Sequence, residues 1–112
     1  MLSTTHINSI EERLSISQST IVAFCKKWQI QELALFGSVL RADFRPDSDI
    51  DVLVTFDPVF RRGLSETIDI HAELAELLQR DVDLIVKKSL QRSENIPRRD
   101  RILNSSQVIY AA

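Results

Sequence analysis

Residues 33–56 read LALFGSVLRADFRPDSDIDVLVTF and contain two apolar runs separated by a polar segment. The first run, Leu33–Phe36, ends at a glycine and has the length of a short buried strand. The second run, Ile50–Phe56, is rich in valine and isoleucine and predicts the strongest strand of the chain. Between them, Arg45–Ser48 has the composition of a turn. We therefore expect two strands with polar residues at both ends of the connection.

Helical patterns surround this pair of strands. Before it, Ser17 is suited to cap a helix that runs to Trp28 and carries the buried stripe Ile21, Phe24, Cys25 and Trp28. After it, a loop over 57–63 leads to a helix over 64–79, whose predicted buried stripe is Leu64, Ile68, His71, Ala75 and Leu78.

The rest of the chain predicts one more strand and one more helix. Residues 82–86 form a third apolar strand, followed by a polar loop with Pro97, a short helix near 98–104 and an apolar tail over 108–110. One or two helical turns are expected over 39–43. The order helix, strand, turn, strand, helix, strand, helix predicts an α/β fold with a small sheet.

The length of 112 residues fits a single domain. We place that domain at 17–112 and treat 1–16 as an N-terminal extension, with a short helix on Ile7, Ile10 and Leu14. No apolar stretch reaches membrane-spanning length and none resembles a signal peptide, so a cytoplasmic protein is expected. A net charge of −2 predicts no direct binding of nucleic acid. The single cysteine, Cys25, allows no internal disulfide.

Asp49 and Asp51 are the most informative pair of residues. They stand two apart at the start of the strongest strand, so their side chains point to the same face. Neighbouring carboxylates repel each other unless a cation lies between them, and their hard oxygens suit Mg²⁺. If the third strand pairs beside the second, Asp83 completes a cluster for two metal ions, the arrangement that supports in-line phosphoryl displacement.

Gly37 and Ser38 are candidates for binding phosphate. They follow a strand directly and open a helical turn, where a glycine lets the backbone approach an anion and a hydroxyl adds a donor. Arg41 lies three residues beyond Ser38, on the same face of that turn, and could neutralise a further phosphate oxygen.

These residues give the chain a family resemblance. Gly-Ser, ten residues and then Asp-x-Asp resembles the core motif of DNA polymerase β-like nucleotidyltransferases, and most closely the minimal nucleotidyltransferase (MNT) antitoxins of HEPN/MNT toxin–antitoxin pairs. The likeness extends to DVDLIVKKSL, around Asp83, and more weakly to RILNSSQVIY, so it covers most of residues 18–110. It implies a small mixed β-sheet flanked by helices.

The resemblance also implies roles for single residues. Gly37 and Ser38 would hold the triphosphate of ATP, with Arg41 and Ser48 as further nucleotide contacts. Asp49, Asp51 and Asp83 would be the catalytic, metal-binding carboxylates, with two Mg²⁺ ions beside the nucleotide. Asp83 would also help to activate the acceptor hydroxyl.

The function implied by the family is transfer of AMP from ATP to a tyrosine of a partner HEPN ribonuclease, which silences that toxin. Two alternatives stay open at this point. The chain could be a non-catalytic antitoxin that neutralises its partner by binding alone, or a nucleotidyltransferase acting on RNA or a small molecule.

Several basic residues have no assigned role. They could be solvated surface charge, or could contact nucleotide phosphates or an acidic partner: Arg45, Arg61, Arg62, Lys87, Lys88 and the cluster Arg98, Arg99 and Arg101. His71 is expected to be a hydrogen-bonded structural histidine.

Overall fold

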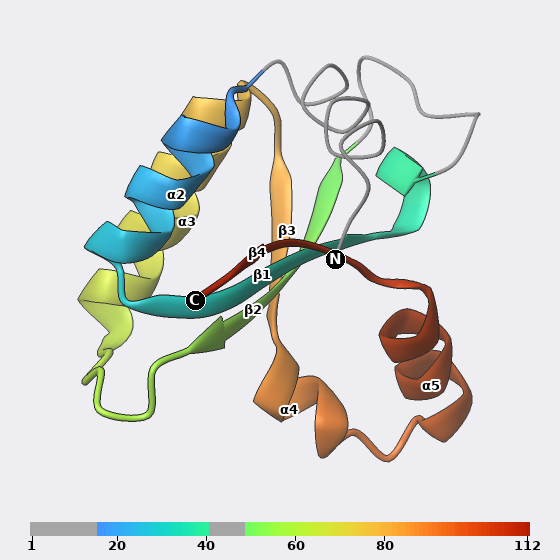
Figure 1. Cartoon of the computed structure of the whole chain (residues 1–112). Coiled ribbons are helices and arrows are strands. Elements are labelled where there is room, and N and C mark those ends of the chain that lie inside the picture. The colour runs from blue at the N-terminus through green and yellow to red at the C-terminus, as the bar shows by residue number, and fades with distance from the viewer. Residues whose placement is uncertain (1–15, 41–48) are drawn as a thin grey trace.

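The computed structural model describes residues 16–40 and 49–112. The described elements are the helices α2 (Gln18–Lys27), α3 (Leu64–Leu78), α4 (Lys87–Gln91) and α5 (Ile96–Ser105), the 3₁₀ turn η1 (Gly37–Leu40), and the strands β1 (Ile30–Phe36), β2 (Ile50–Phe56), β3 (Val82–Val86) and β4 (Gln107–Ala111) (Figure 1). The N-terminal helix expected on Ile7, Ile10 and Leu14 and the turn expected at 45–48 lie outside the described residues.

The four described strands form one mixed sheet in the order β3-β2-β1-β4. β1 is antiparallel to both of its neighbours, whereas β2 and β3 are parallel. Parallel strands need a crossover connection, and α3 supplies it between β2 and β3. The mixed sheet flanked by helices is the predicted fold class, which is confirmed.

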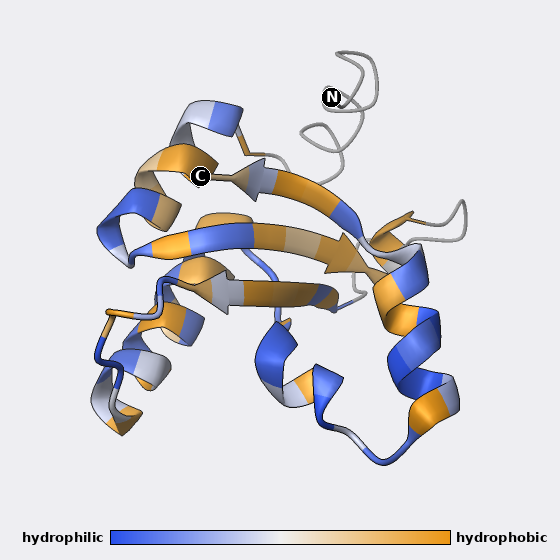
Figure 2. Ribbon diagram, turned by 60° about the horizontal axis from the view of Figure 1, so that its bottom comes forward, coloured by the Kyte–Doolittle hydropathy of each residue, from blue (hydrophilic) through white to orange (hydrophobic). Residues whose placement is uncertain are grey.

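Helices cover both faces of the sheet (Figure 1). Alternate residues of β2, namely Ile50, Val52 and Val54, pack with the buried faces of α2 and α3. Leu53 points the other way and packs with Leu90 of α4 and Ile102 of α5. With apolar packing on both faces, the central strands are hydrophobic along most of their length (Figure 2).

The buried stripe predicted for α3 is wrong in part. Ile70, Leu74 and Leu78 face the core, while Leu64 and Ile68 are 78% and 57% exposed. The helix carries two neighbouring apolar stripes that share Leu78, and helical spacing alone does not determine which of them meets the sheet. His71 also lies off the core and is hydrogen-bonded to β3, as expected for a structural histidine.

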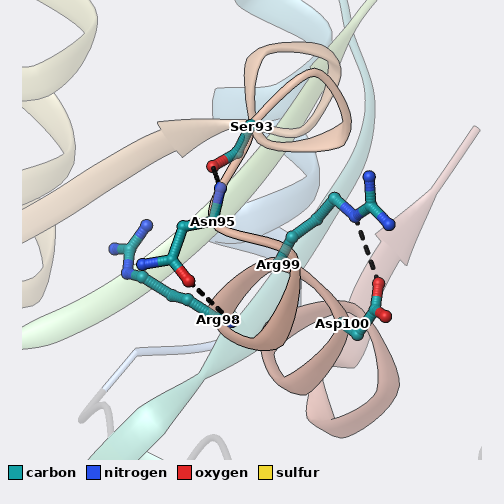
Figure 3. A network of polar contacts seen from close by, with 5 residues as sticks. All are labelled: Ser93, Asn95, Arg98, Arg99 and Asp100. Atoms are coloured by element: carbon teal, nitrogen blue, oxygen red, sulfur yellow. Dashed lines mark hydrogen bonds and ion pairs between the residues drawn. The ribbon is translucent and has the colours of Figure 1, made fainter.

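The ends of the chain's elements also differ from the prediction. β1 starts three residues earlier than expected, and the apolar tail is a strand, β4, paired with β1. The segment after β3, which the sequence predicted to be a loop, begins with the short helix α4. α5 begins earlier because the Asn95 side chain accepts from the backbone N–H of Arg98, which caps the helix with Pro97 in its first turn (Figure 3). η1 replaces the helical turn expected over 39–43, of which only 39–40 are described.

A polar contact joins α2 to α3. Trp28 Nε1 donates a hydrogen bond of 2.9 Å to Glu73 Oε2, and Lys27 forms an ion pair with the other carboxylate oxygen. The Lys27 ammonium is the main reason that the pKa of Glu73 lies below its ordinary value of 4.5, and the Trp28 hydrogen bond acts in the same direction. Trp28 is therefore half-buried at the boundary of the core, whereas Ile21, Phe24 and Cys25 of the predicted stripe are buried.

The lowered pKa of Glu73 predicts a pH-dependent contribution to stability. Since the folded pKa lies below the unfolded one, the stabilisation is present above pH 4.5 and disappears as the pH falls through the folded pKa. Glu73→Gln should lower the free energy of unfolding by less than about 1 kcal/mol at pH 7, since the pair is largely solvated. Urea unfolding between pH 7 and pH 3.5 measures this difference.

The control for this prediction is the same substitution in a Lys27→Gln background. Without the ammonium, the pH-dependent part of the Glu73→Gln effect should be much smaller. An equal effect in both backgrounds would show that Lys27 is not the cause.

Candidate active site

Two predicted carboxylates meet across the parallel strands. Asp51 of β2 is in register with Asp83 of β3, and residues in register on neighbouring parallel strands point to the same face. That face is the one on which Leu53 and Ile85 pack with α4 and α5. Asp49 precedes Asp51 by two residues, and the backbone N–H of Ile50 between them donates to the Asp81 carbonyl at 2.9 Å. The sheet thus brings the start of β2 and the start of β3 together.

Gly37 lies against the Asp51 carboxylate. On the other side of β2, Asp51 is in register with Phe36, the last residue of β1. Gly37 directly follows Phe36 and therefore lies beside the Asp51 carboxylate. A Cβ on Gly37 would overlap Oδ2 of Asp51 and lie 3.2 Å from its Cγ. Gly37 also has a φ of +75°, in the left-handed region that favours glycine. Glycine is therefore required here both by space and by backbone conformation.

The three carboxylates lie at the surface, beside strand residues that are buried. Asp49 and Asp83 are exposed and Asp51 is half-buried, while Ile50 and Val52 are completely buried beneath them. Within residues 16–40 and 49–112, no group of three or more His, Cys, Asp or Glu side chains is gathered closely enough to hold a metal ion by itself. The carboxylates therefore share a face without forming a closed cage of ligands.

This donor set fits Mg²⁺ bound together with a nucleotide. Mg²⁺ keeps several waters and is commonly held by one or two carboxylates and substrate phosphates, not by an all-protein cage. Asp49 and Asp51 supply hard oxygens, and the bare backbone at Gly37 leaves room for a phosphate beside them. Ser38 lies within η1, directly after Gly37. Arg41, Ser48 and Arg45 lie outside the described residues.

Two of the unassigned basic pairs lie at the other end of the sheet. Arg62 stacks on Phe56, with 4.6 Å from its guanidinium carbon to the ring centroid, and donates to Thr67 Oγ1 at 3.0 Å. Lys87 pairs with Glu32 at 3.1 Å. Phe56 ends β2, five residues beyond Asp51, which is about 17 Å along a strand. Arg62 and Lys87 thus line a separate groove of about 860 Å³ and lie far from the carboxylates.

The third basic cluster lies on the carboxylate side. Ile102 of α5 packs against Leu53 and Phe36, on the same sheet face as Asp51. Arg98 and Arg101 of this helix are exposed, while Arg99 forms an ion pair with Asp100 at 3.1 Å (Figure 3). Sequence spacing located this cluster on a helix but could not place it on a face, because that depends on how α5 packs.

Comparison with known proteins identifies the family. The model of the nucleotidyltransferase domain matches residues 19–109. This chain belongs to the nucleotidyltransferase domain family. A protein adenylyltransferase, MntA, of Thermococcus cleftensis is 32% identical over 83 residues, which cover 74% of this chain and 82% of that protein. A Methanocaldococcus jannaschii relative, also named as a protein adenylyltransferase, is 39% identical over 64 residues, 57% of this chain and 64% of its own length.

Solved structures share the fold of this chain. A toxin–antitoxin structure with AMP-PNP superimposes with a TM-score of 0.63 at 19% identity, covering 87% of this chain and 75% of that one. A complex of the tri-AMPylated Shewanella oneidensis HEPN toxin with its MNT antitoxin gives a TM-score of 0.55 at 20% identity, covering 85% and 70%. No helix in the described part of the chain is long and apolar enough to cross a membrane.

The contact between Gly37 and Asp51 makes a direct prediction. Gly37→Ala should reduce nucleotidyl transfer by about 100-fold or more, because the added methyl group displaces the carboxylate by an ångström or more. It should also lower the free energy of unfolding by about 1–2 kcal/mol, since alanine is strained at a positive φ. A radiolabelled-nucleotide transfer assay and urea unfolding measure the two effects.

Gly63→Ala provides the matched control. Gly63 has a φ of −95°, and a Cβ there would meet only the flexible Glu66 side chain, at 3.1 Å. Replacing an N-cap glycine by alanine also costs up to about 1 kcal/mol, so stability falls without a change at the carboxylates. A Gly37→Ala enzyme as active as Gly63→Ala would contradict the role assigned to Gly37.

Proposed function

We propose that this nucleotidyltransferase is a protein adenylyltransferase antitoxin, which transfers AMP from ATP to a tyrosine of a partner HEPN toxin. The two sequence relatives described above are named as protein adenylyltransferases, and the structural neighbours include an MNT antitoxin in complex with an AMPylated HEPN toxin. A second neighbour carries an ATP analogue, AMP-PNP, which supports ATP as the nucleotide.

The observation that carries this proposal is the placement of the Asp51 carboxylate. It lies against the bare backbone of Gly37 and in register with Asp83, so one side chain links the phosphate-binding turn to the third carboxylate. A triphosphate and an acceptor hydroxyl must come together within a few ångströms for in-line transfer. No other residue of β2 adjoins both the turn at Gly37 and Asp83.

Each residue then has a defined task. Gly37 and Ser38 hold the triphosphate by their backbone, while Asp49, Asp51 and Asp83 would hold Mg²⁺. Bound Mg²⁺ would neutralise phosphate charge and stabilise the leaving pyrophosphate. Asp83 accepts the proton of the acceptor tyrosine or orients its oxygen towards the α-phosphorus. The tyrosine oxygen forms a bond to that phosphorus as the bond to pyrophosphate breaks.

The acceptor is a protein side chain in this proposal. Asp49 and Asp83 are exposed, so a residue on the surface of a folded partner can reach them. The exposed Arg98 and Arg101 of α5 lie on the same side of the sheet and offer positive charge to an acidic part of the partner.

Removal of the carboxylates tests the proposal. With ATP and Mg²⁺ present, the HEPN partner should gain mass in steps of about 329 Da, one for each AMP added. Asp49→Asn plus Asp51→Asn should abolish this gain, because the amides cannot hold the metal. Intact-mass spectrometry of the partner measures the transfer. Asp69→Asn plus Glu76→Gln is the control, since it removes the same charge from two exposed carboxylates of α3 and should leave transfer intact.

The same variants separate catalysis from simple binding. If the Asp49/Asp51 double variant suppresses the toxin in cells as well as the wild type does, the chain acts by binding alone and the proposal fails. Addition of nucleotide to free RNA without a protein partner would instead favour the RNA-directed alternative.

A further inference from the structure

The carbonyl of Val82 faces the outer edge of the sheet. β3 is an edge strand, paired only with β2 among the described strands. Ile50 of β2 is in register with Val82. The Ile50 N–H donates to the carbonyl of Asp81, the residue that precedes Val82. Backbone carbonyls point in alternate directions along a strand. The carbonyls of Asp81 and Asp83 therefore point towards β2, and the carbonyl of Val82 points away from it.

His71 of α3 meets this outward carbonyl. Its Nε2 lies 2.7 Å from the Val82 oxygen, and because a carbonyl only accepts, Nε2 carries the donated proton. Both the neutral Nε2–H tautomer and the imidazolium can make this bond. The Val82 side chain is buried in the core beneath α3, so the residue is fixed by its side chain, by its carbonyl and by its neighbours' bonds to β2.

We infer that His71 is a positioning residue for Asp83. The inference rests on the proposed function, in which Asp83 serves the acceptor and metal. Asp83 directly follows Val82, and the peptide group that joins them carries the oxygen bound by His71. A rotation of that peptide would turn the Asp83 side chain on its exposed edge, away from its register partner Asp51. The hydrogen bond from α3 restrains this rotation from the side that β2 cannot reach.

Two substitutions of His71 isolate the donor. Glutamine places its amide nitrogen as many bonds from Cα as His Nε2 and can donate to Val82, whereas leucine fills similar space and cannot. The two residues have nearly equal helix propensity, so α3 itself is equally stable in both. Trp28→Phe is the control, since it removes the bond to Glu73 and loosens α3 two residues away without touching β3.

The first measurement is Mn²⁺ binding to the full chain by electron paramagnetic resonance, with a non-hydrolysable ATP analogue present. His71→Leu should weaken Mn²⁺ binding about tenfold, a typical cost of losing a group that orients a metal ligand. His71→Gln should retain most of the wild-type affinity for Mn²⁺. Trp28→Phe should bind Mn²⁺ like the wild type although it unfolds at a lower temperature.

Transfer kinetics provide the second readout. In His71→Leu, kcat should fall about tenfold while KM for ATP stays unchanged, because Gly37 and Ser38 belong to the other side of the site. Equal Mn²⁺ affinity in His71→Leu and the wild type would overturn the inference, as would equal losses in His71→Leu and His71→Gln. A wild type that binds Mn²⁺ and nucleotide but transfers no AMP would instead refute the proposed function, with the role of His71 still decided by the metal titration.

Discussion

The fit of the Asp51 carboxylate against the backbone of Gly37 is the constraint on which the site depends. It requires a glycine with a positive φ at the end of β1 and a carboxylate at the second residue of β2, held together by the antiparallel ladder between these strands. Neither residue could be displaced without shifting a ladder most of whose other members are buried in the core. The rigidity of the central strands therefore becomes precision at a solvent-facing site.

The parallel pairing of β2 with β3 supplies the other half of the arrangement. A crossover through α3 brings the beginning of β3 beside the beginning of β2, so Asp83 lies next to Asp51 instead of at the far end of the sheet. An antiparallel hairpin would have reversed β3 and separated them. The carboxylates, η1 and the face of α5 consequently gather on one side, while Arg62 and Lys87 occupy a groove at the opposite end.

The sequence was sufficient to predict the fold class and where the residues of the candidate site lie in the fold. Gly37, Asp49, Asp51 and Asp83 stand next to strong strand patterns, so their positions follow from local spacing and alternation. The role of Ser38, Arg41 and Ser48 remains a prediction, as do the metal ligands themselves.

Other features could not be predicted because they depend on contacts between distant segments. The apolar residues of α3 form two possible stripes, and packing against the sheet selects Ile70 and Leu74 over Leu64 and Ile68. The strand β4 exists because the edge of β1 is available to it, which no pattern in residues 107–111 reveals. The hydrogen bond from His71 to Val82 likewise depends on how the crossover helix lies along β3.

Anomalous diffraction from crystals of the chain grown with Mn²⁺ and a non-hydrolysable ATP analogue tests the central claim most directly. The account predicts a Mn²⁺ peak bound by carboxylate oxygens of Asp49 and Asp51, with the triphosphate against Gly37 and Ser38. A metal and nucleotide bound elsewhere, for instance in the groove beside Arg62 and Lys87, would contradict it.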